Sequence, residues 1–204
     1  VFAKNKKAAG ALSTQTAQHQ MNKIYYAVVY TKEDLTGKRG TLTDWLVKEA
    51  SIARVCDASQ NGAKKAVLSW KCLACQGNRA LLEVELETGR FHQIRVQMAG
   101  HGLPLWGDNR YHPQFGGTAL AADMDKKMNC GENGSGQMSR EQTNSGRMGR
   151  EQIALAAWKL TFTHPETGKT MTFSHLPENA VFSCFPEFLK MKEEALEKKK
   201  GKTE

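Results

Sequence analysis

The residues best suited to chemistry lie in one short block, 88–95, which reads Thr-Gly-Arg-Phe-His-Gln-Ile-Arg. The block opens a stretch with helical spacing, in which one face carries three apolar residues: Phe91, Ile94 and Met98. That face can anchor a helix, while His92 and Arg95 on a neighbouring face point along the rim of a cleft. Arg90 lies at the expected helix start, where backbone N–H groups already favour an anion. A surface helix with solvated arginine and histidine explains the block equally well.

Cysteine offers a second possible chemistry, metal binding. The chain has five cysteines, of which Cys72 and Cys75 form one Cys-x-x-Cys. A structural zinc site needs two more ligands at suitable spacing, and the sequence has no second Cys-x-x-Cys and no His-x-x-x-His. The pair also lies in the apolar run 67–75. Buried, reduced thiols are therefore the favoured interpretation, and they suit a cytoplasmic protein.

The segment before the block predicts the elements that must position it. Leu82, Val84 and Leu86 alternate with glutamates, which is typical of a half-buried strand with an acidic outer face. This strand is expected to pair with residues 64–75 as a hairpin across the turn at 76–78. Downstream, Gly100 and Gly102 should end the helix that starts near Phe91.

The rest of the chain predicts further strands and few helices. Strands are expected at 23–30, 51–56, 153–162 and 170–174, and turns at 37–40, 61–62 and 164–168. Helices are expected at 4–20, at 41–50 with Thr41 or Thr43 as the cap, and at 185–198. Many strands with few helices between them indicate an α+β fold with a largely antiparallel sheet.

Composition suggests where the domain ends. Residues 116–149 are rich in Gly, Ser, Met, Asn and Arg, which predicts a flexible insertion, most simply a spacer without function. We expect one domain over 1–190 and a basic tail over 191–204. The chain begins with Val rather than Met, and 1–3 look like part of a strand, so we expect the true start to be missing.

Net charge points toward a polyanionic partner. The chain carries 29 Lys and Arg against 21 Asp and Glu, a net charge of +8, with a pI near 9.3. Nucleic acid is the commonest such partner, although much of the excess lies in the lysine-rich end. No apolar run approaches the length of a membrane span, and the first ten residues do not form a secretion signal.

Three motifs in order make a family resemblance specific. The 88–95 block is followed by Gly-x-Pro at 102–104 and by Gly-Asp-x-x-Tyr at 107–111. This run resembles the signature of the RluA-type RNA pseudouridine synthases. Lys23, Tyr25 and Ala27 are similar to a second block of that family, and 153–165 resembles its closing strands. The resemblance covers nearly the whole chain outside 116–149 and the lysine-rich end.

The resemblance implies a fold, a reaction and roles for residues. The fold would be a mixed, mainly antiparallel sheet with a central catalytic cleft. The reaction would isomerise uridine to pseudouridine in ribosomal or transfer RNA, without cofactor or metal. Arg95 would pair with a nucleophilic aspartate, and Tyr25 would pack on the flipped-out uracil. Ile94 would form an apolar floor under the base, and Lys23, Arg90 and His92 would contact the RNA. From the residues alone, Tyr25 is also compatible with a core tyrosine.

The sequence departs from the family pattern in three places. Phe91 and Gln97 replace the usual small hydroxyl residue and histidine. The family's His-Arg-Leu-Asp block normally precedes a strand like 1–4, and none of the chain's six aspartates has that context. We therefore expect the nucleophile upstream and the 204-residue chain to be inactive. Asp108 follows a glycine in a turn, where a carboxylate caps backbone N–H groups, so a structural role is favoured.

Two functional alternatives remain. A non-catalytic RNA-binding protein could retain the fold without the nucleophile. The retention of Tyr25 and Arg95 favours an enzyme, because a binding protein has less use for an arginine aimed at a carboxylate. A basic globular protein without an RNA substrate would require the motif match to be chance.

Overall fold

A computed structural model describes residues 1–112 and 152–200 of the chain. The predicted insertion at 116–149 and the end of the tail, 201–204, lie outside these residues. The described helices are α1 (Lys6–Ala17), α2 (Gln93–Gly100), α4 (Ala180–Ser183) and α5 (Pro186–Lys200). The strands are β1 (Asn22–Tyr30), β2 (Arg39–Glu49), β3 (Ile52–Cys56), β4 (Lys64–Gln76), β5 (Arg79–Leu86), β6 (Leu155–Thr163) and β7 (Thr170–Ser174).

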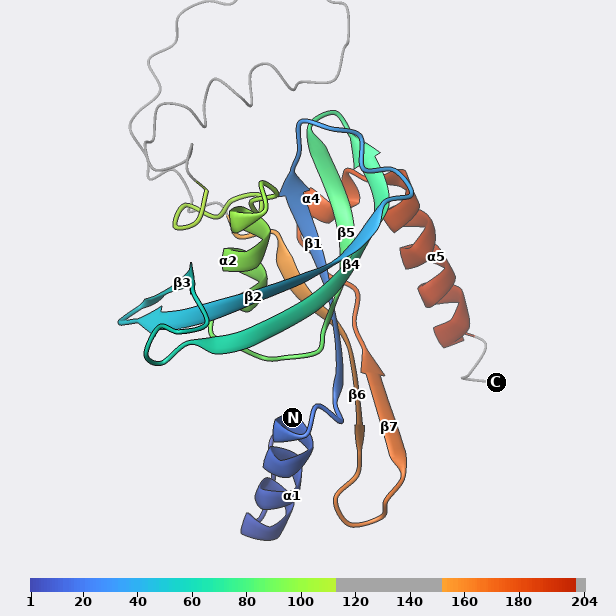
Figure 1. Cartoon of the computed structure of the whole chain (residues 1–204). Coiled ribbons are helices and arrows are strands. Elements are labelled where there is room, and N and C mark those ends of the chain that lie inside the picture. Colours follow the sequence, from blue (N-terminus) through green and yellow to red (C-terminus); the bar gives the residue numbers. More distant parts are fainter. Residues whose placement is uncertain (113–151, 201–204) are drawn as a thin grey trace, which may run out of the picture.

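The strands form one twisted sheet in the order β3-β2-β4-β5-β1-β6-β7, with β3 and β7 at its opposite edges (Figure 1). Every pairing among the described strands is antiparallel, so the sheet is antiparallel rather than mixed. The expected β4–β5 hairpin is confirmed, with Gln76 facing Arg79 across the turn. The α+β class is likewise confirmed.

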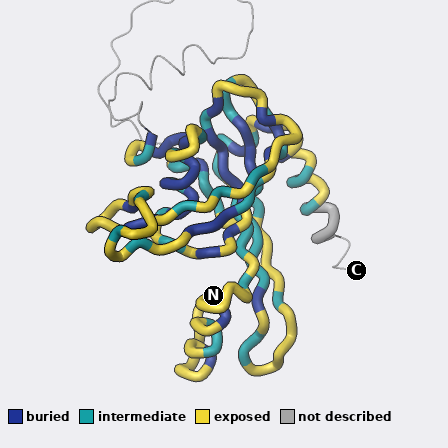
Figure 2. The backbone as a smooth tube through the Cα atoms, in the orientation of Figure 1, coloured by how far each residue is buried: buried dark blue, intermediate teal, exposed yellow. Residues whose placement is uncertain are grey.

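Side chains of β1 alternate between two cores on the two faces of the sheet. Ala27 and Val29 belong to a core that also contains Ile94 and Met98 of α2, and Tyr25 packs against it. Tyr26 and Val28 belong to a second core, which includes Phe182 of α4, Phe185 just before α5 and Phe188 in the first turn of α5. The central strands are the most buried part of the residues that the structure describes (Figure 2). Tyr25 therefore shares its face of the sheet with α2.

The predicted helix at 41–50 is wrong, because these residues form β2 between β3 and β4. Threonine and tryptophan at alternate positions, Thr41, Thr43 and Trp45, favour a strand. The hydrogen-bond ladders that join β2 to β3 and to β4 outweigh the weak helix propensity of residues 41–50. Ala50, at φ 49°, makes the tight turn into β3.

Two other local expectations need correction. α2 begins at Gln93 rather than near Phe91, because His92 adopts a left-handed conformation with φ 53° that a right-handed helix cannot contain. Phe91 consequently lies outside the helix and is exposed, whereas Ile94 and Met98 are buried as expected. The segment 1–3 precedes α1 without forming a strand.

α1 and the far ends of β6 and β7 extend from the main body as a largely exposed arm (Figure 2). At the other end of the chain, α5 runs continuously through residue 190, and Met191 packs against the second core. In the part of the chain that the structure describes, no helix is long and apolar enough to cross a membrane.

Candidate functional site

Arg95 on α2 forms a two-pronged ion pair with Asp108. Its Nε donates to Oδ2 and its Nη2 to Oδ1, each at 2.8 Å. The Asp108 side chain is fully buried and that of Arg95 is 14% exposed. Burial of Asp108 favours its neutral form, but the bonds from Arg95 and from two backbone N–H groups hold the pKa of its carboxyl below the ordinary value. The same pair raises the pKa of Arg95. Both groups are therefore charged at neutral pH.

A turn at Gly107 presents Asp108 to Arg95. Gly107 has φ +75°, and a Cβ there would lie 2.7 Å from the carbonyl oxygen of Gln152, so only glycine fits. Asp108 Oδ1 also accepts the N–H groups of Arg110 and Tyr111, which is the capping role expected for it. The preceding segment is fastened to β1, because Trp106 donates its N–H to the Val28 carbonyl.

His92 connects Arg95 to Tyr111. Arg95 Nη1 donates to His92 Nε2 at 3.2 Å, and His92 Nδ1 lies 2.9 Å from the Tyr111 hydroxyl. Because guanidinium has no acceptor, Nε2 must be unprotonated and Nδ1 must carry the proton. Burial and then the positive charges of Arg95 and Arg110 lower the pKa of His92. The imidazole is thus neutral and held by two hydrogen bonds.

Gln93 fastens the start of α2 to the sheet. Its Oε1 accepts from the Thr88 hydroxyl and from the Arg90 N–H, both at 2.8 Å, and its Nε2 donates to the Val67 carbonyl. The Thr88 hydroxyl in turn accepts the Val67 N–H at 2.8 Å. These buried bonds explain why Thr88 and Gln93 belong to one motif. They fix the position from which His92, Ile94 and Arg95 project.

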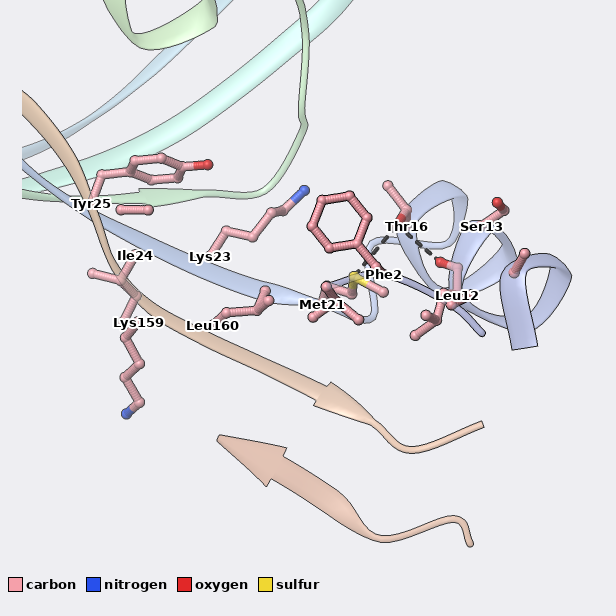
Figure 3. A pocket seen from close by; sticks show the side chains of 14 residues that line it. Phe2, Leu12, Ser13, Thr16, Met21, Lys23, Ile24, Tyr25, Lys159 and Leu160 are labelled. Carbon is pink, nitrogen blue, oxygen red and sulfur yellow. Dashed lines mark hydrogen bonds between the residues drawn. The ribbon is translucent and has the colours of Figure 1, made fainter. Parts of the chain in front are cut away.

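Tyr25 lines a pocket of about 480 Å³ between α1, β1, β6 and the N-terminal residues. Figure 3 shows Tyr25, Lys23 and Phe2 extending to the same side of β1, whereas Lys159 points away. Tyr25 is half-buried, and this burial raises the pKa of its phenol. The ring is therefore a neutral aromatic surface with a protonated hydroxyl at neutral pH.

The predicted RNA-contacting residues occupy different surroundings. The Lys23 Nζ lies close to Gly89, 3.2 Å from where a Cβ would stand, and partial burial lowers the pKa of Lys23. Arg90 Nε donates to the Lys65 carbonyl at 2.9 Å, so one of the N–H donors of this guanidinium is already used within the protein. Ile94 is buried in the core against which Tyr25 packs. Lys23 and Tyr25 thus approach the 88–95 block from β1.

Sequence reasoning missed the parts that two residues, Asp108 and Tyr111, play in the Arg95 cluster. Asp108 was expected to cap a turn, and its pairing with Arg95 was not foreseen. Tyr111 received no role, yet its hydroxyl accepts the Ala53 N–H, and its ring lies 4.9 Å from the Arg95 guanidinium. The Gly-Asp-x-x-Tyr spacing was the available signal, because residues 108 and 111 return to one side of a helical turn.

The cysteines show no metal centre in the described residues, where no group of three His, Cys, Asp or Glu side chains could hold an ion. The Sγ atoms of Cys72 and Cys75 lie 3.5 Å apart, as free thiols. Burial, followed by the hydrogen bond between Cys72 and Cys75, raises the pKa of Cys72 to about 12. Cys72 is thus a protonated core residue.

Comparison with known proteins identifies relatives of this chain. A family model described as RNA pseudouridylate synthase matches residues 1–100. An uncharacterised RNA pseudouridine synthase of Bacillus subtilis is 36% identical over 113 residues, which cover 54% of this chain and 36% of the relative. The ribosomal large subunit pseudouridine synthase D of Neisseria meningitidis serogroup A is 32% identical over 85% of this chain and 40% of its own. The corresponding protein of Zymomonas mobilis is 29% identical over 88% of this chain and 49% of its own.

Solved structures show the same fold. Human RNA pseudouridylate synthase domain containing 1 superposes with a TM-score of 0.54 at 18% identity, covering 86% of this chain and 62% of that one. Human RNA pseudouridylate synthase domain containing 4 gives a TM-score of 0.55, also at 18% identity, over 85% of this chain and 65% of that one. The chain spans about half or less of the length of the three curated relatives described above.

Proposed function

Because the chain belongs to the RluA-type family of RNA pseudouridine synthases, we propose that Tyr25 and the Arg95 cluster are parts of a site that isomerises uridine to pseudouridine in RNA. The observation that carries this proposal is the shared face of the sheet. Tyr25 packs against the core that contains Ile94, one residue before Arg95. An aromatic surface, an apolar floor and a fixed cation are the groups that a flipped-out uracil and an ionised carboxylate require.

Arg95 suits the role of holding a second carboxylate. A guanidinium has five N–H donors, and three of them bond Asp108 and His92. One donor on each terminal nitrogen has no acceptor among the residues that the structure describes. A nucleophilic aspartate paired there would stay ionised and aimed at the sugar. Asp108 and His92 would act through Arg95, by fixing its plane.

Tyr25 would pack on the detached base. Its raised phenol pKa favours a neutral ring over a phenolate, so stacking is the role its surroundings support. Lys23, Arg90 and His92 would line the approach of the RNA, and Lys23, whose ammonium lies beside Gly89, also lines the pocket. Ribosomal or transfer RNA is the proposed substrate class, and the cytoplasm, where reduced thiols persist, is the proposed location.

Tritium release from RNA labelled at C5 of uridine tests the proposal, with large-subunit ribosomal RNA and transfer RNA assayed separately. In a longer polypeptide that carries the His-Arg-Leu-Asp block, Tyr25→Leu and Arg95→Lys should each lower the rate about 100-fold or more. Tyr25→Phe should retain most RNA affinity, because it keeps the ring. Arg54→Gln, in an exposed ion pair with Glu49, is the matched control and should not change the rate.

The chain from Val1 to Glu204 is expected to release no tritium by itself. Its described aspartates lack the family context, and Asp108 is engaged by Arg95 and two backbone N–H groups. Robust turnover by this chain would overturn the assignment and make Asp108 the first suspect. RNA binding without turnover in the longer polypeptide would favour a non-catalytic RNA-binding protein.

A further inference from the structure

Phe91 is an exposed aromatic at the edge of the Arg95 cluster. The residue is 41% exposed, although it belongs to the block that anchors α2. The left-handed conformation of His92 separates it from the buried face of the helix. Single exposed apolar residues are ordinary, so exposure alone assigns nothing to Phe91.

One face of the Phe91 ring packs on the neighbouring His92. It stacks on the His92 imidazole with centroids 3.9 Å apart and an interplanar angle of 22°. His92 is itself fixed by its contacts with Tyr111 and Arg95. A preorganised aromatic surface loses little conformational entropy when a ligand stacks on it. Phe91 therefore differs from a freely rotating surface phenylalanine.

The surroundings of Phe91 are positively charged. The Lys48 ammonium from β2 lies 4.7 Å from the ring centroid. Arg90 is the preceding residue, and the positive charges of Arg95, Arg110 and Lys48 all act to lower the pKa of His92 beneath the ring. Asp108, the carboxylate that acts on His92, is paired with Arg95, and Glu49, which follows Lys48 in the chain, is paired with Arg54. The face thus combines a partly exposed aromatic ring with Lys48 and Arg90, which form no ion pair with a carboxylate of the described residues.

We propose that Phe91 is a stacking platform for a nucleobase that flanks the reacting uridine, and that Lys48 contacts the phosphate of that nucleotide. This inference rests on the proposed RNA substrate. A cation over an exposed ring contributes a factor of about 2 to 5 to an equilibrium. A nucleobase stacked on an aromatic contributes a factor of about 5 to 150. The base therefore displaces Lys48 from the ring, and the displaced ammonium remains within reach of the backbone.

The platform also touches the proposed site. His92 lies between Phe91 and Arg95, with Arg95 Nη1 3.2 Å from its ring nitrogen. A flanking base on Phe91 would hold the strand beside Arg95 while the target uridine enters the Tyr25 pocket. Since Phe91 replaces the family's small hydroxyl residue, this contact would be a feature of this chain's own RNA recognition.

Equilibrium binding of single-stranded uridine-containing RNA to the Val1–Glu204 chain tests the platform, without depending on turnover. Phe91→Ala should weaken binding about 5- to 150-fold, and Phe91→Trp should bind like the original chain. Lys48→Gln should reduce the salt dependence by about the 0.7 expected for one phosphate contact. Phe173→Ala is the matched control, because Phe173 is 53% exposed on β7 at the opposite edge of the sheet.

A second readout guards against misfolding. RNA carrying the fluorescent base 2-aminopurine should be quenched by the original chain and by Phe91→Trp, and not by Phe91→Leu, which keeps apolar volume without a ring face. Unchanged affinity and quenching in Phe91→Ala and Phe91→Leu would overturn the platform, even if the enzyme is active. Loss in those variants, without tritium release by any longer polypeptide, would support the platform and overturn the proposed isomerase. No RNA binding by any variant would overturn both.

Discussion

At the scale of single residues, the unusual feature is an arginine that is paired and still has donors to offer. Asp108 occupies Nε and Nη2 of Arg95, and His92 accepts from Nη1. The Asp108 carboxylate thus holds Arg95 in one orientation, because a two-pronged ion pair fixes the plane of the guanidinium. Lysine could not replace Arg95, since its ammonium is a point charge on a flexible side chain and has no plane to fix.

Asp108→Asn should destabilise the protein by about 3 kcal/mol or more, because it leaves a buried guanidinium without its counter-charge. Since the folded pKa of Asp108 is depressed, its stabilisation is complete above the ordinary pKa, about 4, and is lost as pH falls through the lower folded value. Urea unfolding at a series of pH values measures this difference.

The matched control is Asp57→Asn, at an exposed position, which should stay within about 0.5 kcal/mol of the original chain. The difference in stability between the original chain and Asp108→Asn should shrink below pH 4 and stay constant above it. A difference that grows as pH falls would contradict the ion pair described here.

At the scale of elements, the site depends on a helix whose start is fixed by side chains rather than by propensity. Gln93 bonds Thr88, Arg90 and β4, and the Ile94 and Met98 side chains bury the opposite face. The helix α1, which lines the Tyr25 pocket, is held differently. Its described buried side chains are only Ala8 and Gln15, too little apolar surface to fasten a helix of this length.

Gln15→Ala should release α1 from the body of the protein. Gln15 donates to the Thr163 carbonyl at 2.8 Å and accepts the Thr163 N–H at 2.9 Å, so it completes the end of β6 as a neighbouring strand would. Losing two such bonds should cost about 1 to 3 kcal/mol. Hydrogen exchange should show faster exchange in α1 with little change in β4 and β5.

Gln18→Ala, at the exposed C-cap of the same helix, keeps the backbone cap and should leave exchange in α1 nearly unchanged. Because α1 lines the Tyr25 pocket, Gln15→Ala should also alter ligand access there. Protection of α1 that survives Gln15→Ala would mean that other contacts hold this helix.

At the scale of the whole molecule, charge divides between the proposed site and the end of the chain. Residues 198–204 contribute four lysines and one glutamate, a net charge of +3. Lys23, Lys48 and Arg90, near the pocket and the 88–95 block, carry the same total. The two sets make different predictions for RNA binding, because Lys23 lines the pocket with Tyr25 and Lys48 lies over the Phe91 ring.

RNA binding by the Val1–Glu204 chain should be weak and should fall steeply with salt. Replacing Lys23, Lys48 and Arg90 by glutamine should make the plot of log affinity against log salt shallower, reducing the magnitude of its slope by about 2. Each phosphate contact on a single strand contributes about 0.7 to that magnitude. Deleting 198–204 removes the same net charge and should have a smaller effect. If affinity disappears with the deletion alone, the pocket side of the sheet is not the RNA surface.

The sequence by itself determined most elements and the family. The alternating strand at 82–86, its hairpin with 64–75 and the helix carrying Ile94 and Arg95 were predictable, because local periodicity records which side chains face a core. The order of motifs pointed to the family in the same way. The prediction of a helix at 41–50 was wrong: the alternating Thr41, Thr43 and Trp45 favour a strand, and the pairing with β3 and β4 that fixes it is not contained in a local pattern.

Only the tertiary structure decided which charged groups meet. Arg95 and Asp108 are 13 residues apart, and the turn at Gly107, fastened to β1, brings the carboxylate to the guanidinium. The outward position of Phe91 likewise depends on the left-handed residue that follows it. Ion pairs and aromatic stacks require approach within a few ångströms, and that approach is set by backbone turns and packing between elements far apart in the chain.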